Sequence, residues 1–185
     1  MASLARGNLH AGRRRRVERP PGSPSPRSKG RTSLTATLLY RIAAAVLVLF
    51  AAGHTFGFLS FRPPSAEGLA VYSAMNSVRF EFNGAARSYG EFYTGFGLMV
   101  TAYLLFFAFL AWHLGGLAAS RPQAIGALSW AFATVQLASL VLSIVYFFVV
   151  PAVMSAVIVV CLLWAAWLVR RAAPGDDASH LVRES

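Results

Sequence analysis

The chain has 185 residues, of which 56% are apolar and only 13% charged, against about 25% charged residues in an average soluble domain. This balance argues against a soluble globular protein and favours one embedded in lipid. The net charge of +10 suggests a nucleic-acid partner only superficially, because nine of the seventeen basic residues lie in the first 33 positions and no basic folded module follows. We therefore expect no nucleic-acid partner. Cys161 is the only cysteine, which excludes intramolecular disulfides and multi-cysteine metal sites.

Residues 1–33 predict a disordered basic tail. The stretch RPPGSPSPRSKGR lacks apolar periodicity and offers too little apolar surface to offset the entropy of ordering. A start codon placed too far upstream would also explain it. We expect a membrane domain at residues 34–171 and a polar C-terminal tail at residues 172–185.

Four segments are long and apolar enough to span a bilayer, whose core of about 30 Å needs about 20 helical residues. Residues 122–169 contain no charged side chain, and this length fits two spans joined by a tight turn. Pro151 predicts that turn, since proline loses a helical hydrogen bond and restricts the residue before it. The predicted spans are residues 38–60, 91–114, 124–149 and 152–170.

These segments are apolar all round, whereas a helix of a soluble bundle has a charged face. The sequence therefore predicts an all-α fold, an integral membrane four-helix bundle. Lys and Arg placement sets the orientation: fourteen basic residues fall on the side of the N-terminus and three on the other. Both termini are thus predicted to be cytoplasmic. The four tryptophans agree, since all fall at the cytoplasmic ends of their spans: Trp112, Trp130, Trp164 and Trp167.

The one longer loop, residues 61–90, is predicted to lie outside. Pro63, Pro64 and Ser65 are typical of a helix start, and apolar residues then recur every third position, which indicates a short amphipathic helix. Further on, Asn83-Gly84 is a turn signal, so a brief hairpin or a plain loop follows. The periodic residues are Leu69, Tyr72, Met75 and Val78.

Polar residues inside spans need partners, because lipid supplies none. At about 1.5 Å rise per residue, His54 in the stretch GHTFGF lies about 9 Å below the outer boundary. It is predicted to share a layer with residues at the outer ends of the second and third spans, near Arg87. These candidates for a ligand site or polar cluster are Glu91, Tyr93, Thr94 and Tyr146. Gln136 continues the set along one face of the third span with Ser129, Ser139 and Ser143.

Each of these features also has a structural interpretation. Gln136 and the serines can hydrogen-bond between helices for modest stability. Gly53 with Gly57, and Gly90 with Gly97, allow close helix packing. For His54 with Glu91, we weigh a structural tie, a ligand or proton-handling site, and a lipid-facing histidine without a role.

Other chemistry receives little support. His113 lies near the cytoplasmic end of its span, so it and His54 cannot ligate one haem iron together. The sequence shows no nucleophile elbow, phosphate loop, HExxH motif or acidic metal cluster. We predict no metal site and assign no cofactor.

Spans one and two carry a motif: a histidine flanked by glycines in RIAAAVLVLFAAGHTFGF, then AMNSVRFEFNG and RSYGEFYTGFGL. Residues 38–170, which include this motif, resemble a family of small bacterial integral membrane proteins of unknown function. The resemblance implies a four-helix membrane bundle in the bacterial inner membrane. It does not indicate an activity, because none is established for the family. The matching residues are His54, Arg87, Ser88, Tyr89, Glu91, Phe92, Tyr93, Gly95 and Gly97.

The leading hypothesis is a non-enzymatic membrane protein that binds a small apolar or amphipathic, lipid-like ligand in an outer-leaflet pocket. Arg87 and Glu91 would fix a polar head, while Phe56, Phe92 and Phe96 hold an apolar body. One alternative is a membrane oxidoreductase or related enzyme in which His54 and Glu91 transfer protons near a quinone or haem. Another is an accessory subunit whose small-residue faces dock a membrane-complex partner, and the sequence leaves homo-oligomerisation open.

Overall fold

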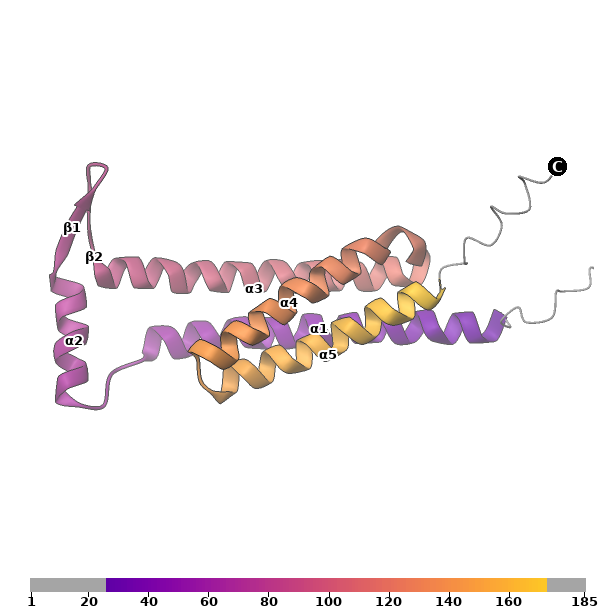
Figure 1. Cartoon of the computed structure of the whole chain (residues 1–185), viewed down its shortest axis with the longest axis horizontal. Helices are drawn as coiled ribbons and strands as arrows, with labels where there is room; N and C mark the ends of the chain where they lie inside the picture. The colour runs from indigo at the N-terminus through magenta and orange to yellow at the C-terminus, as the bar shows by residue number, and fades with distance from the viewer. Residues whose placement is uncertain (1–25, 173–185) are drawn as a thin grey trace, which may run out of the picture.

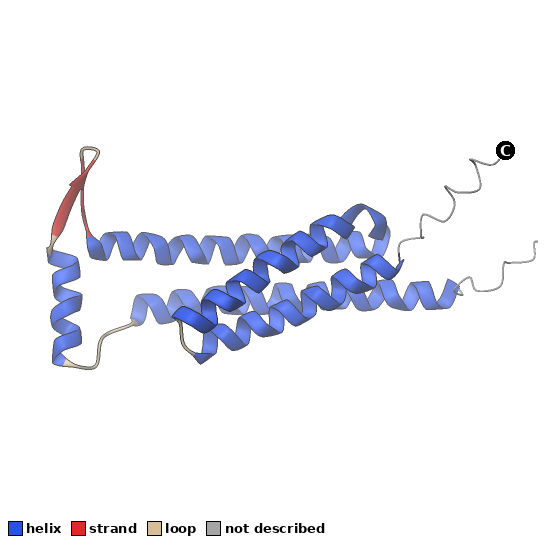
Figure 2. Ribbon diagram, viewed as in Figure 1, coloured by secondary structure: helices blue, strands red, loops and turns tan. Residues whose placement is uncertain are grey.

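The computed structural model describes residues 26–172, and this part of the chain is helical apart from one short hairpin and the connecting loops (Figure 2). It contains four helices long and apolar enough to cross a membrane. The prediction of an all-α bundle of four apolar helices is therefore confirmed for the described residues. The helices are α1 (Pro26–Ser60), α3 (Tyr89–Ser120), α4 (Gly126–Tyr146) and α5 (Val149–Ala172), and a short 3-10 helix, η1 (Pro122–Ile125), precedes α4.

The first helix starts earlier than predicted. α1 begins at Pro26, so residues 26–33 are helical and the predicted tail is corrected there. Proline is accepted in the first turn of a helix, and each residue added to an existing helix gains a hydrogen bond. The hydroxyl of Ser33 donates to the carbonyl of Ala118 at 2.8 Å, which anchors this extension on α3. Residues 1–25 and 173–185, with the rest of the predicted tails, lie outside the described residues.

α1 is the central helix of the bundle. Figure 1 shows α3 and α5 running beside it and α4 crossing diagonally, and α4 packs mainly on α5. Small and apolar residues repeat along α1 at spacings of three and four, the period that lines one helix face. The fully or nearly fully buried members of this stripe are Ala36, Tyr40, Ala43, Ala44, Leu47 and Ala51.

The turn between α4 and α5 differs from the prediction. The chain leaves helix at Phe147 and Phe148, and α5 begins at Val149. Pro151 therefore lies in the first turn of α5 and not in the turn itself. The first backbone N–H groups of a helix have no intrahelical acceptor, so a proline there loses no hydrogen bond. Proline in a sequence can therefore indicate the start of a helix as well as its end.

The segment between α1 and α3 forms a helix and a hairpin at one end of the bundle. Ser65 caps helix α2 (Ala66–Ser77), its hydroxyl accepting from the Gly68 amide at 3.1 Å. Strands β1 (Arg79–Phe82) and β2 (Ala85–Ser88) then pair antiparallel. Asn83 and Gly84 both have positive φ, 51° and 77°, as a two-residue hairpin turn requires. Figure 1 shows α2 lying across the ends of α1 and α3.

Candidate functional site

His54 connects α1 to α3. Its Nε2 lies 3.1 Å from the carbonyl oxygen of Gly97, an acceptor, so Nε2 carries the proton and donates. The imidazole also stacks on the ring of Phe58, with 5.8 Å between centroids and 3° between planes. One residue on, the hydroxyls of Thr55 and Thr101 lie 2.8 Å apart. The histidine is thus satisfied as an interhelical tie.

The four predicted packing glycines divide into two kinds. A Cβ added at Gly97 would meet the ring of Phe58, and one added at Gly90 would meet the side chain of Asn76 from α2. These two glycines bring neighbouring elements close to α3. By contrast, nothing lies within 4 Å of a Cβ added at Gly53 or Gly57. Within the described chain, no helix uses those two for close approach.

Glu91 stabilises the start of α3. Its Oε2 accepts from the amide of Ser88 at 2.7 Å, and the Ser88 hydroxyl accepts from the amide of Glu91 at 3.0 Å. This reciprocal pair is a capping box, which satisfies two free amides at a helix N-terminus. Arg79 from β1 adds an ion pair with Glu91, with 3.8 Å between Nη2 and Oε2. The carboxylate is therefore engaged with the hairpin and not with His54.

The residues predicted to share one layer do not lie together, because those on α3 occupy opposite faces of the helix. At about 100° per residue, Gly90, Tyr93 and Gly97 fall on the face toward α1 and α2. Glu91 and Phe92 fall on the other face. Equal depth in the membrane does not bring such residues together.

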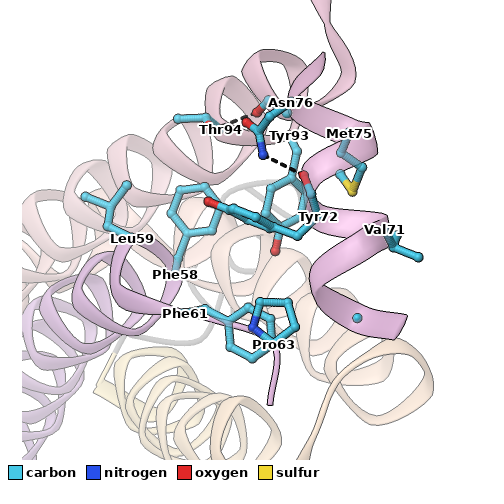
Figure 3. A pocket seen from close by; sticks show the side chains of 12 residues that line it. Phe58, Leu59, Phe61, Pro63, Val71, Tyr72, Met75, Asn76, Tyr93 and Thr94 are labelled. Carbon is cyan, nitrogen blue, oxygen red and sulfur yellow. Dashed lines mark hydrogen bonds between the residues drawn. The ribbon is translucent and has the colours of Figure 1, made fainter. Parts of the chain in front are cut away.

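A partly open cavity of about 300 Å³ lies between the end of α1, helix α2 and the first turns of α3. We call it the α2 cavity. Figure 3 shows the rings of Phe58, Tyr72 and Tyr93 grouped around it, with Asn76 on the α2 side. Among the predicted site residues, Tyr93 and Thr94 line it.

The polar groups of the α2 cavity are few. Asn76 Nδ2 donates to the carbonyl of Tyr72 at 2.7 Å, and the Thr94 hydroxyl donates to the carbonyl of Gly90 at 2.8 Å. The Tyr93 hydroxyl makes no hydrogen bond within the described residues. Most of the remaining lining is apolar. The Tyr72 hydroxyl accepts from Arg62 at 3.5 Å. The cavity therefore offers an apolar body with two phenols, an amide and a hydroxyl, the usual combination in small-molecule sites.

A second, open depression of about 520 Å³ runs along the opposite face of α3. We call it the α3 groove, and its lining includes Arg87 and Glu91, which the sequence placed at the polar end of a pocket. Phe92 and Phe96, predicted to hold an apolar body, line it as well, whereas Phe56 does not. The six lining residues are Arg87, Glu91, Phe92, Gly95, Phe96 and Met99.

Gln136 and Tyr146 lie in α4, away from both depressions. Gln136 is only 3% exposed, and its Nε2 has no hydrogen-bond partner among the described residues. Tyr146 is 74% exposed at the end of α4 and makes no hydrogen bond within the described residues. Two serines of the predicted stripe do contact other helices, as expected: Ser129 accepts from Tyr40 at 2.7 Å, and Ser143 lies 3.3 Å from Ser155.

The two histidines of the described residues, His54 and His113, occupy separate sites. His113 stacks on Phe109 near the far end of α3, about 24 Å of helix from Gly97 at about 1.5 Å per residue. Within residues 26–172, no three histidine, cysteine or acidic side chains group as metal ligands. The two histidines therefore act independently of one another.

Sequence reasoning missed the contribution of α2 to the cavity. The recurrence of Tyr72 and Met75 indicates a helix, but no local pattern indicates that this helix folds back over Gly90. Asn76 was not singled out at all. The S-x-x-E spacing of Ser88 and Glu91 is a recognisable capping-box signature, and it would have assigned Glu91 its structural partner.

Comparison with known proteins gives no match, either to a protein-family model, to a curated protein or to a solved structure. The resemblance to small bacterial membrane proteins thus remains a prediction that depends on its motif residues. Function has to be argued from the site.

Proposed function

We propose that this is a bacterial inner-membrane protein with both termini in the cytoplasm and α2 at the outer surface. The excess of basic residues on the terminal side supports this orientation. So do Arg41 and Arg171, which stack on Trp112 and Trp167 at 3.3 and 3.6 Å from the ring centroids. Both pairs lie at the end opposite α2, where cationic and aromatic side chains anchor helices at a membrane surface.

Cysteine accessibility tests this orientation. In a Cys161→Ala background, Glu67→Cys on α2 should react with a membrane-impermeant maleimide added outside intact cells. Labelling from the cytoplasmic side alone would contradict it.

Helix α2 itself has no buried residue and lies across the bundle end (Figure 1). We propose that it rests in the membrane interface.

The function best supported is binding of a small amphipathic molecule in the α2 cavity, without catalysis. The observation that carries this proposal is the partly open cavity, whose lining is apolar except for the free Tyr93 hydroxyl and the polar groups of Tyr72, Asn76 and Thr94. Its volume of about 300 Å³ is at the lower end of ligand sites, which run from about 300 to 1,000 Å³. It would accommodate a compact amphiphile or one end of a lipid. His54 supports the site from below through Phe58, which contacts both His54 and Tyr93.

The test compares two tryptophan substitutions on α2. Val71 lines the cavity and Ala70 does not, although both are exposed residues of the same helix. Val71→Trp should fill the cavity. The amount of a molecule that co-purifies in mild detergent, identified by mass spectrometry, should then fall by about tenfold or more. Ala70→Trp should retain it. Equal retention in both variants would refute the assignment.

The same sample distinguishes the alternatives. A Soret or flavin absorption band would favour a membrane oxidoreductase. A second protein at fixed stoichiometry would favour an accessory subunit. Gly53 and Gly57 form an open small-residue face on α1, which such a partner or a second copy would use.

A further inference from the structure

The α3 groove is separate from the α2 cavity and differs from it chemically. It lies on the opposite face of α3, with Arg87 and Glu91 at the hairpin end and Phe92, Phe96 and Met99 along the helix. Gly95 forms part of its floor, and nothing lies within 4 Å of a Cβ added there. The groove is therefore an open channel with a charged end and an apolar length.

The aromatic wall of the groove is held in place by the hairpin. Phe92 packs edge-on against Phe96, with 4.9 Å between centroids, and edge-on against Phe80 of β1 at 6.0 Å. Phe80 also contacts Tyr89 at 4.9 Å. Edge-to-face contacts of this kind stabilise aromatic pairs beyond their buried area. The wall is thus preorganised before any ligand binds.

The charged end of the groove has one guanidinium that makes no ion pair among residues 26–172. Glu91 is occupied by the Ser88 amide and by Arg79. Arg87 donates only to the neighbouring carbonyl of Ala86, at 3.2 Å, and has no carboxylate within ion-pair distance among residues 26–172. Because Glu91 is already engaged, the Arg87 guanidinium is available for an anion.

We infer that the α3 groove binds an anionic phospholipid from the leaflet at the α2 end of the bundle. Arg87 takes the phosphate, since the planar guanidinium fork suits phosphate oxygens. An acyl chain lies over Gly95 along Phe92, Phe96 and Met99. A zwitterionic headgroup fits less well, because Arg79 and Ser88 already occupy the carboxylate that would receive its cationic group.

Native mass spectrometry of the full chain tests the headgroup contact. The protein is released from nanodiscs containing equal parts phosphatidylglycerol and phosphatidylcholine, and retained lipids are counted. The wild type should prefer phosphatidylglycerol, and Arg87→Gln should reduce that preference about tenfold, as expected for loss of one charge-assisted hydrogen bond. Arg62→Gln is the matched control, because Arg62 is exposed at the same end and lines neither depression.

A second pair of variants tests the acyl contact. Gly95→Leu should fill the channel and reduce retained phosphatidylglycerol severalfold, while Gly116→Leu, an equally open glycine of α3, should not. The inference is overturned if the wild type shows no preference, if either pair behaves alike, or if excess inorganic phosphate alone abolishes the preference. Arg87, Gly95 and Gly116 do not line the α2 cavity, so the results of Arg87→Gln and Gly95→Leu are independent of the small-molecule test.

Discussion

The two ends of the bundle differ although α1 runs through both. From Ala36 to Ala51, α1 presents a buried stripe to α3 and α5, and we call this region the packed end. Beyond Ala51 most of α1 is exposed, with Phe56 at 75%, and its contacts with α3 depend on His54, Thr55 and Phe58. This α2 end also contains both depressions. The difference indicates that the packed end supplies stability, which allows the α2 end to keep open volume and free polar groups.

The largest effect should come from cutting a side chain at the packed end. Leu47 is fully buried, whereas Leu59, on the same helix, is 51% exposed. Leu47→Ala should lower the free energy of unfolding by about 2–4 kcal/mol, through lost contacts and the cavity left behind. Leu59→Ala should change it by no more than about 0.5 kcal/mol. Unfolding in mixed micelles with increasing sodium dodecyl sulfate measures both, and similar losses would contradict the contrast.

The glycines of the α2 end should respond with opposite signs. Gly97→Ala displaces Phe58, on which His54 stacks, and should cost about 1–2 kcal/mol of stability, as overpacking does. Gly53→Ala adds a methyl group into open space and should stabilise the helix by up to about 1 kcal/mol. The same micelle titration compares them. A loss at Gly53 would show that a neighbour outside this chain uses that face.

The smallest effect concerns the packed end and should be a gain in the free energy of unfolding. The buried Nε2 of Gln136 has no partner within the described chain, and an unsatisfied buried polar group costs about 1–3 kcal/mol. Gln136→Leu keeps a similar volume and removes that group, so the midpoint of unfolding should rise by the equivalent of about 1 kcal/mol. A fall instead would mean that the amide has a partner, such as a second copy or a bound molecule.

The sequence predicted the parts of the fold that local chemistry determines. Hydropathy located four apolar helices, and Ser65 predicted the start of α2. Asn83-Gly84 predicted a turn, which the structure shows to be that of a hairpin. It failed where one residue has two structural meanings: Pro151 fits a turn and also the first turn of a helix.

The sequence predicted the depth of the site residues in the membrane but not the helix face on which each of them lies. His54, Glu91 and Tyr93 do belong to the same end of the bundle, but helices that are apolar all round carry no periodic signal to show which face meets which neighbour. Tyr93 faces α2 and Glu91 faces away, a distinction that only packing reveals. The cavity also depends on α2 folding over Gly90, a non-local contact with no signature in the sequence.

Photolabelling tests the central claim that the α2 end holds a small-molecule site and the packed end does not. A fatty acid carrying a diazirine group is added to the protein in membranes, illuminated, and its attachment is mapped by peptide mass spectrometry. We predict that labels on α2 and on the peptide containing Phe58 exceed those at the packed end, and that Val71→Trp, but not Ala70→Trp, removes the labels on α2 and Phe58. Labels spread evenly along the lipid-facing helices, and unchanged by Val71→Trp, would contradict the account.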